Sequence, residues 1–316
     1  MRRREFITDV AGIGASAAAL SGVGAALGAA ADQRAGTPGA GDKRRRIAVS
    51  TWSLHSYFST TRGKSSTLPG KMLELLDFPE MIADRYKLHH LEFVAPHFAS
   101  VEPGYLKELK ARLAQAHSHL VNIPVDIPEI GRGGGLSDPD EQVRSAAIAG
   151  VKKWIDIGAE LGTRAARCDP GQMKAENLAP TIDSYKQLAA YAKARGVDVI
   201  IENHGGVGSE HPEELVKLFE GVGKDFKGAL PDFANFPDEP TRERGLKLLV
   251  PYARVLCHAK GLEFDAQGNE TKFNFSRCME ISKQAGFKGI YSIEFEGPGD
   301  PYVGVQKTLD ELLRYL

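Results

Sequence analysis

Four short apolar segments, each followed or ended by an acidic residue or a histidine, most constrain what this chain can fold into. The first, residues 199–201, precedes Glu202 and His204 and then two glycines. Apolar, partly β-branched runs bounded by glycine are typical of strands buried on both faces. Three later segments share this form; they are 228–233, 254–261 and 289–297. We therefore expect a parallel sheet with polar side chains at the carboxyl ends of its strands.

The spacing of these segments predicts a barrel. They recur at intervals of roughly thirty residues, about the length of one strand-and-helix unit of an eightfold barrel. Earlier strands are predicted at 46–52, 88–94, 120–125 and 163–168. Helices are predicted at 73–82, 105–117, 138–161, 178–195, 213–219, 243–252, 276–284 and 302–316. The alternation favours a parallel sheet, and eight strands favour a closed (β/α)8 TIM barrel over an open sheet.

Composition excludes several classes of protein. The chain has 316 residues, of which 42% are hydrophobic and 26% charged, with a formal net charge of −1. Such a chain can bury a large core, and it lacks the basic surplus expected of a nucleic-acid-binding domain. Its three cysteines, Cys168, Cys257 and Cys278, show no C-x-x-C spacing. Neither a disulfide framework nor a zinc knuckle is expected.

The amino terminus resembles a twin-arginine export signal. Residues 3–7, Arg-Arg-Glu-Phe-Ile, fit the R-R-x-F-[L/I] pattern, and 29–31, Ala-Ala-Ala, fit an A-x-A cleavage site. The resemblance implies a signal peptide at 1–31, a flexible linker at 32–45, a barrel at 46–316 and a periplasmic or secreted location. A basic disordered tail is the alternative. A membrane-spanning helix is disfavoured because the apolar segment 10–31 is rich in glycine. No membrane partner is therefore expected after the signal is removed.

Polar residues at the ends of the last four strands predict a metal site. They are Glu202, Asp232, His258 and Glu294. Three carboxylates and an imidazole at one barrel mouth would raise one another's pKa sharply unless a cation lies between them. Mostly oxygen donors with one nitrogen suit Mn²⁺ best, with Mg²⁺, Co²⁺ and Zn²⁺ as alternatives. The alternative, four unrelated residues with local partners, is disfavoured because all four occur in consecutive units.

Other residues are placed near the mouth by their position after a strand. Trp52 and His55 follow the first strand and His97 follows the second, so all three are candidate substrate contacts. For Trp52, core packing is the alternative. The segment 126–138 is long and rich in glycine, but it lacks the Lys-Ser/Thr pair of a phosphate-binding loop. It is predicted to be a mobile lid that carries Arg132 over the substrate.

From residue 46 to its end the sequence resembles the sugar phosphate isomerase/epimerase group of xylose isomerase-like TIM barrels, which includes ketose 3-epimerases and inosose dehydratases. The family's Glu, Asp, His and Glu at the ends of strands five to eight are matched by I-I-E-N-H, L-P-D-F-A-N, C-H-A-K and I-E-F-E-G. The resemblance implies a divalent metal and a sugar or polyol substrate. Lys260 and His204 match further family positions. Asn235, a candidate substrate contact, stands where the epimerases have histidine, which puts ketose 3-epimerisation in question.

These groups predict proton transfer next to a sugar carbonyl. A metal on the carbonyl and the neighbouring hydroxyl would stabilise the enediolate formed when a carboxylate removes the proton between them. Glu202 and Glu294 are the predicted acid/base pair as well as ligands, and Lys260 and His204 are predicted to orient or protonate substrate oxygens. Return of the proton to the opposite face gives epimerisation, its transfer to the next carbon gives isomerisation, and loss of a β-substituent gives elimination.

The sequence therefore predicts a metal-dependent isomerase or epimerase. An exported enzyme meets few sugar phosphates, so unphosphorylated sugars, including keto sugars, are the expected substrates. The first alternative is a lyase or hydratase that acts on keto-glycosides by elimination. An endonuclease IV-like phosphodiester hydrolase and a non-catalytic sugar-binding protein are further alternatives, and the near-neutral charge counts against the hydrolase. Pairing of helix faces into a homo-oligomer is left open.

Overall fold

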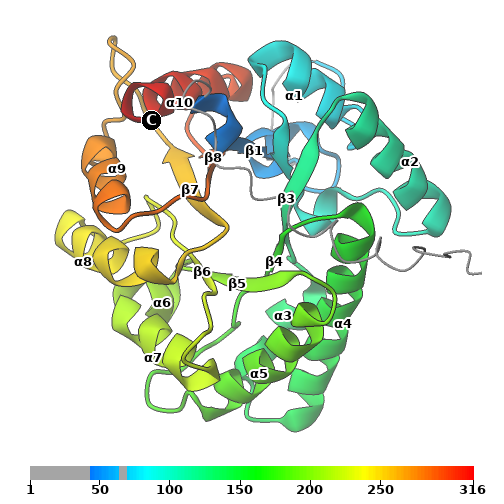
Figure 1. Cartoon of the computed structure of the whole chain (residues 1–316), viewed down its shortest axis with the longest axis vertical. Coiled ribbons are helices and arrows are strands. Elements are labelled where there is room, and N and C mark those ends of the chain that lie inside the picture. Colours follow the sequence, from blue (N-terminus) through cyan, green and yellow to red (C-terminus); the bar gives the residue numbers. More distant parts are fainter. Residues whose placement is uncertain (1–42, 64–69) are drawn as a thin grey trace, which may run out of the picture. The chain divides into compact units, whose positions relative to one another are not determined.

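Eight parallel strands form one sheet whose hydrogen-bonded order is β6-β5-β4-β3-β2-β1-β8-β7 (Figure 1). The computed structural model describes residues 43–63 and 70–316, so the predicted export signal lies outside the described residues. The strands are β1 (Ile47–Ser50), β2 (His90–Glu92), β3 (His119–Pro124), β4 (Ala165–Arg167), β5 (Asp198–Glu202), β6 (Ala229–Leu230), β7 (Leu256–Gly261) and β8 (Ile290–Phe295). The predicted (β/α)8 TIM barrel is confirmed.

Helices surround the ring of strands (Figure 1). They are α1 (Phe78–Tyr86), α2 (Pro103–Gln115), α3 (Pro128–Gly131), α4 (Glu141–Leu161), α5 (Ala179–Lys193), α6 (Gly206–Glu210), α7 (Pro212–Val222), α8 (Glu239–Leu249), α9 (Phe275–Gln284) and α10 (Pro301–Tyr315). Short 3-10 helices are η1 (Lys43–Arg46), η2 (Thr51–Tyr57), η3 (Ala95–His97), η4 (Gly135–Ser137) and η5 (Val250–Tyr252). Of the helices within 43–63 and 70–316, none has the length and apolar character needed to cross a membrane.

Two layers of side chains explain why the polar groups gather at one end of the barrel. An apolar cluster comes from seven strands or their immediate approaches; its members are Ala48, Val121, Ala165, Ile200, Leu230, Val255, Leu256 and Ile290. Residues two positions apart on a strand point to the same side. Glu202, Asp232 and His258 each follow a member of this cluster by two positions. The polar layer therefore lies beyond the apolar one, towards the carboxyl ends where barrel chemistry takes place.

The barrel closes between β6 and β7 at two of the predicted ligands. Strand β6 is shorter than the predicted segment 228–233, and Pro231, which has no N–H to donate, follows it directly. Beyond it an isolated parallel bridge pairs Asp232 with His258. His258 N donates to Pro231 O at 2.9 Å, and Phe233 N donates to His258 O at 3.2 Å. The backbone itself therefore sets these two side chains next to each other.

Three local predictions differ from the structure. The first helix begins at Phe78 rather than near residue 73, with Pro79 in its first turn. Helix α8 begins four residues earlier than predicted because Asp238 caps it, accepting from Thr241 N at 2.8 Å. Residues 43–45, predicted as linker, belong to η1, where the Lys43 ammonium group donates to Leu313 O at 2.8 Å.

The predicted lid at 126–138 contains regular structure. It comprises α3 and η4, and Leu136 of η4 is fully buried. Ser184 Oγ donates to Leu136 O at 2.7 Å, which ties the segment to α5. Arg132, the residue expected to reach the substrate, is exposed between α3 and η4.

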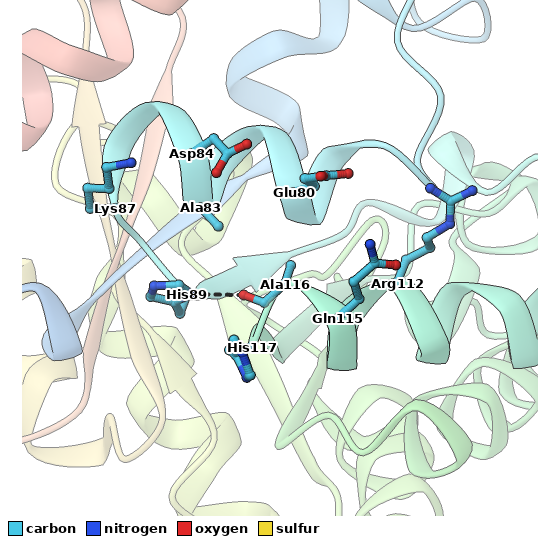
Figure 2. A pocket seen from close by; sticks show the side chains of 9 residues that line it. All are labelled: Glu80, Ala83, Asp84, Lys87, His89, Arg112, Gln115, Ala116 and His117. Carbon is cyan, nitrogen blue, oxygen red and sulfur yellow. Dashed lines mark hydrogen bonds between the residues drawn. The ribbon is translucent and has the colours of Figure 1, made fainter.

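A groove of about 370 Å³ lies at the opposite end of the barrel (Figure 2). It is lined by the carboxyl-terminal turns of α1 and α2 and by the residues that lead into β2 and β3. Its lining is of mixed charge, with Glu80, Asp84 and Lys87 from α1 or its end and His89, Arg112 and His117 from the other segments. This is the amino-terminal face of the strands, where residues serve stability rather than catalysis. The groove is therefore separate from the polar layer.

Candidate metal centre

The structure brings the four predicted ligands together. Glu202 ends β5, Asp232 follows β6, His258 lies in β7 and Glu294 lies in β8. One potential ligand atom from each lies within 4.8 Å of the others. Their side chains are at most 8% exposed. Four side chains from four neighbouring strands thus form one buried, mostly acidic cluster.

The imidazole of His258 points one nitrogen into this cluster. Its Nδ1 atom lies 3.0 Å from Glu202 Oε1, 3.4 Å from Glu294 Oε2 and 3.6 Å from Asp232 Oδ2. The carboxylates hold the pKa of His258 well above its usual range, even though burial alone would lower it. Nδ1 is therefore the nitrogen available to a cation at the centre of the cluster.

Glu202 is held by a buried arginine from β4. Arg167 Nε donates to Glu202 Oε2 at 2.8 Å, and its Nη2 atom lies 2.7 Å from the same oxygen. The same guanidinium lies 2.5 Å from Asp126 and 3.3 Å from Asp169, and its side chain is 5% exposed. Burial would raise the pKa of Glu202, but Arg167 and His258 outweigh it and hold the pKa well below its usual range. Glu202 is therefore ionised at neutral pH.

Glu294 has the opposite character. Burial raises the pKa of its carboxyl to about 7, and the attraction of Lys260 and His258 does not offset the effect. The Lys260 ammonium group contacts Glu294 closely and lies 3.3 Å from Asp232 and 3.1 Å from Glu296. Three carboxylates keep the pKa of Lys260 well above its usual range despite burial. The two glutamates of the cluster therefore differ in protonation near neutral pH.

The donor set fits a divalent cation. Asp232 Oδ1 accepts from the backbone of Ala234 at 2.7 Å and of Asn235 at 2.8 Å. Its other oxygen, Oδ2, is buried and accepts no hydrogen bond from the described residues, although Lys260 Nζ lies 3.3 Å and His258 Nδ1 3.6 Å from it. This oxygen therefore faces the cluster with a lone pair free to bind a cation. Three carboxylates and one imidazole nitrogen match the ligands that Mn²⁺, Mg²⁺, Co²⁺ and Zn²⁺ accept.

His204 and Asn235 lie beside Glu202. Asn235 Nδ2 donates to Glu202 Oε1 at 3.1 Å, so this amide belongs to the cluster. His204 is half-exposed, and its Nδ1 lies 2.8 Å from Asp169 Oδ2. That hydrogen bond raises the pKa of His204 to about 9. Glu202, Asp169 and His204 form a second acidic group, but Arg167 already lies among its carboxylates.

Trp52 and His55 reach the site through a glutamate that sequence reasoning missed. Trp52 Nε1 donates to Glu296 Oε1 at 2.5 Å, and Glu296 also holds Lys260. The rings of Trp52 and His55 are stacked with centroids 4.8 Å apart. His55 Nδ1 donates to Trp52 O at 2.9 Å, which leaves Nε2 as its outward nitrogen. Both rings therefore line the side of the mouth next to Lys260.

His97 lies inside the wall of the mouth and is 4% exposed. Thr61 Oγ1 donates to His55 O, so it accepts from His97 Nε2 at 2.9 Å. The neutral ring then carries its only N–H hydrogen on Nε2, so Nδ1 accepts from Thr51 Oγ1, also at 2.9 Å, and Thr51 Oγ1 itself accepts from a backbone N–H. Burial lowers the pKa of His97 to about 3, so the ring is neutral. Both nitrogens are used within the protein, and the ring stacks on Phe58 at 3.9 Å.

A model of the xylose isomerase-like TIM barrel family matches residues 83–316. The chain belongs to this family. No curated protein is significantly similar in sequence. Solved structures with this fold include an L-ribulose 3-epimerase, which is 17% identical with a TM-score of 0.63 over 86% of this chain and 94% of that one. At such identity the likeness establishes the fold.

Two further structures carry metals. The IOLI protein, solved with a bound zinc atom, is 13% identical with a TM-score of 0.64 over 86% of this chain and 99% of that one. A xylose isomerase-like TIM barrel protein from Mycobacterium smegmatis, solved with magnesium, is 15% identical with a TM-score of 0.59 over 85% and 96% of the two chains.

In this xylose isomerase-like barrel, charged residues outside the predicted set complete the centre. Glu92 of β2 is fully buried and lies 3.2 Å from His258 Nε2. Arg167 of β4 binds Glu202, and Glu296 joins Lys260 to Trp52. Glu92 and Arg167 each interrupt an apolar strand in the sequence. A buried charge needs a partner, so this interruption is the signal that could have revealed them.

Proposed function

We propose that the protein is a divalent-metal-dependent isomerase or epimerase that acts on an unphosphorylated sugar or polyol, keto sugars included. The observation that carries the proposal is the convergence of four ligand atoms within 4.8 Å around two glutamates of different pKa. Relatives in fold include a D-tagatose 3-epimerase-like protein, an L-ribulose 3-epimerase and a D-psicose 3-epimerase solved in the presence of D-fructose. The metal-bound relatives support a divalent ion, which we take to be Mn²⁺.

The ion would be held by Glu202, Asp232, His258 Nδ1 and Glu294. When bound, it supplies Lewis-acid stabilisation of the negative charge that develops on the sugar oxygens. Lys260 and Trp52 line the same mouth, so a sugar that reaches the cluster meets an ammonium donor on one side. Asn235 and the half-exposed His204 lie on the side of Glu202.

The two glutamates are suited to moving one proton. A carboxylate takes the proton from the carbon beside the carbonyl, the C–H electrons become the carbon–carbon double bond, and the carbonyl oxygen takes up the charge. The opposite carboxyl group then returns a proton to carbon. Of the two glutamates, Glu294 holds a proton more readily, because burial raises its pKa to about 7 whereas the pKa of Glu202 lies well below its usual range. Glu202, kept ionised by Arg167, starts as the base.

Elimination from keto-glycosides is the second candidate. It shares the first proton removal, and Asn235 favours it because an amide cannot relay a proton to the substrate as a histidine could. Phosphodiester hydrolysis with several metal ions is less well supported. Arg167 already supplies the cation for Asp126, Asp169 and Glu202, where an additional ion would otherwise be expected.

A deuterium exchange experiment tests the proposal. The Mn²⁺-loaded protein is incubated in D₂O with a panel of keto sugars, keto-glycosides and abasic DNA, and the products are followed by NMR and mass spectrometry. We expect solvent deuterium at the carbon next to the carbonyl, and loss of exchange after chelation. A product with a new double bond would identify elimination instead. No exchange with any sugar would overturn the proton-transfer proposal.

We also propose export through the twin-arginine pathway to the periplasm or the medium. The support is the arginine pair and the A-x-A site near the amino terminus. Replacing Arg3 and Arg4 by lysine should leave the uncleaved protein in the cytoplasm of a bacterial host that has this pathway. Unchanged export of the variant would contradict the proposal.

A further inference from the structure

We propose that Glu92 and Asn122 form a positioning pair that fixes the orientation and tautomer of His258, so that its Nδ1 lone pair faces the metal. The inference rests on the proposed metal site and adds two residues to it that touch neither metal nor substrate. Both come from strands of the first half of the barrel, β2 and β3, and both are fully buried.

The two nitrogens of His258 face different partners. Nδ1 lies 3.0 Å from Glu202 Oε1, within the ligand cluster. Nε2 lies 3.2 Å from each carboxylate oxygen of Glu92, on the opposite side of the ring. An ionised carboxylate can only accept hydrogen bonds, so Nε2 must carry a hydrogen. A neutral imidazole with its hydrogen on Nε2 keeps its lone pair on Nδ1, which is the form that binds a metal.

Asn122 places a second hydrogen-bond donor next to Glu92. Asn122 Oδ1 accepts from the backbone N–H of Arg167 at 3.0 Å. The amide is thereby oriented, and its Nδ2 donates to Glu92 Oε2 at 2.9 Å. Turning the amide over would leave the Arg167 N–H without its acceptor in a buried place. Glu92 Oε2 therefore accepts from both Asn122 Nδ2 and His258 Nε2, and its Oε1 atom, which lies 3.2 Å from the same Nε2, has no hydrogen-bond partner among the described residues.

The isosteric change Glu92→Gln breaks this arrangement. A glutamine has one acceptor oxygen and one donor NH₂ group. If its oxygen takes the place of Oε2, it can still accept from Asn122, but its NH₂ group then takes the place of Oε1, 3.2 Å from His258 Nε2, where it opposes the hydrogen on that nitrogen and favours the tautomer whose hydrogen lies on Nδ1 and blocks the metal. If its oxygen faces His258, its NH₂ group opposes the donor of Asn122. Either arrangement weakens metal binding with almost no change in volume.

Mn²⁺ affinity measured by competition with a chelator tests the inference. We expect Glu92→Gln to weaken Mn²⁺ binding about 10- to 100-fold. The double variant Glu92→Gln/Asn122→Asp should recover most of the loss, because the glutamine NH₂ group can then donate to the new carboxylate while its oxygen faces His258. The visible absorption spectrum of bound Co²⁺ should change in the single variant and return towards the wild-type spectrum in the double variant.

The matched control is Glu311→Gln. Glu311 is another buried glutamate; it lies on α10, and its carboxylate accepts from Glu270 N at 3.0 Å. It should leave Mn²⁺ affinity unchanged. Thermal unfolding in chelator verifies that each variant is folded. Glu92→Asp, which keeps both acceptors on a shorter chain, is the second variant and should bind Mn²⁺ more tightly than a glutamine at the same position.

Two results would overturn the inference while leaving the metal site intact. One is a folded Glu92→Gln protein with wild-type Mn²⁺ affinity. The other is a double variant that binds no more tightly than the single variant. A wild-type protein that binds neither Mn²⁺ nor Co²⁺ would instead remove the proposed metal site, and the positioning role with it.

Discussion

The two halves of the barrel contribute differently to its centre. Strands β5 to β8 supply all four candidate ligands in the part of the chain that the structure describes, each near a strand end. Strands β2 to β4 supply Glu92, which contacts His258, Arg167, which binds Glu202, and Asn122, which donates to Glu92. The comparison teaches that a metal centre needs buried groups that hold its ligands as well as the ligands themselves.

The largest expected effect is on activity and comes from the half of the barrel that supplies the ligands, strands β5 to β8, here called the ligand half; strands β1 to β4 form the supporting half. Glu294→Gln should lower the rate of solvent-deuterium exchange by about a thousandfold or more, because a proton-transfer group is lost. The rate is measured at saturating Mn²⁺, where Glu92→Gln should retain most of its activity. Equal losses in the two variants would erase the distinction between ligand half and supporting half.

The next effect comes from the supporting half. Arg167→Met should lower the free energy of unfolding by about 3 to 5 kcal/mol, because it leaves buried carboxylates without their cation. Urea unfolding measures it. The control is Arg254→Met, which removes an exposed pair with Asp198 at 2.5 Å and should cost less than about 1 kcal/mol. Similar losses in the free energy of unfolding for the two variants would show that Arg167 contributes no more than an exposed ion pair does.

Within the supporting half, His97 is buried in the wall of the barrel mouth, whereas His55 lines the mouth itself, so their substitutions should have different effects. His97→Leu should lower the free energy of unfolding by about 1 to 3 kcal/mol, since two threonine hydroxyls lose their partner. It should leave KM unchanged, whereas His55→Leu should raise KM and leave stability unchanged. A raised KM in His97→Leu would return His97 to the substrate contacts.

The contribution of His97 to the free energy of unfolding should depend on pH, in a direction that its pKa determines. The pKa of His97 is lowered from 6.5 to about 3 in the folded protein. A depressed histidine pKa contributes stability above the unfolded value, and this contribution is lost as pH falls from about 6.5 towards 3. The stability difference between wild type and His97→Leu should therefore shrink on acidification.

The smallest effect concerns the two glutamates of the ligand half. Glu294, with a pKa of about 7, must lose a proton before it can bind a metal, whereas Glu202 is already ionised. The slope of log Mn²⁺ affinity against pH should therefore be steeper by about one below pH 7 than above it. Chelator competition at several pH values measures the slope. A slope that does not change near pH 7 would contradict the difference between the glutamates.

The ligand half could be predicted from the sequence because its signal is local. An acidic residue or histidine at the end of an apolar strand marks Glu202, Asp232, His258 and Glu294, and the repeat of the unit indicates the barrel. The supporting half could not, because Glu92 meets His258 only across the barrel, 166 residues later in the sequence. Which residue Glu92 contacts depends on the direction in which each side chain points inside the closed barrel.

His97 shows the limit of reasoning from strand ends. Its position after β2 predicted a substrate contact, yet Thr51 and Thr61 occupy both ring nitrogens. Only the tertiary arrangement shows that these hydroxyls reach it. Likewise, the glycine-rich segment 126–138 was predicted to be a mobile lid, but Leu136 within it is fully buried.

The bridge between Asp232 and His258 has a consequence for the integrity of the sheet. Strands β6 and β7 are the two ends of the hydrogen-bonded order, and this bridge alone pairs them in the described chain. Unpaired strand edges invite association with other chains, and barrels avoid this by closing. An ion shared by Asp232 and His258 would fasten the place where the ring is joined. Loss of the ion should therefore first be felt as an opening of this edge, with faster exchange of the amide hydrogens of His258 and Phe233.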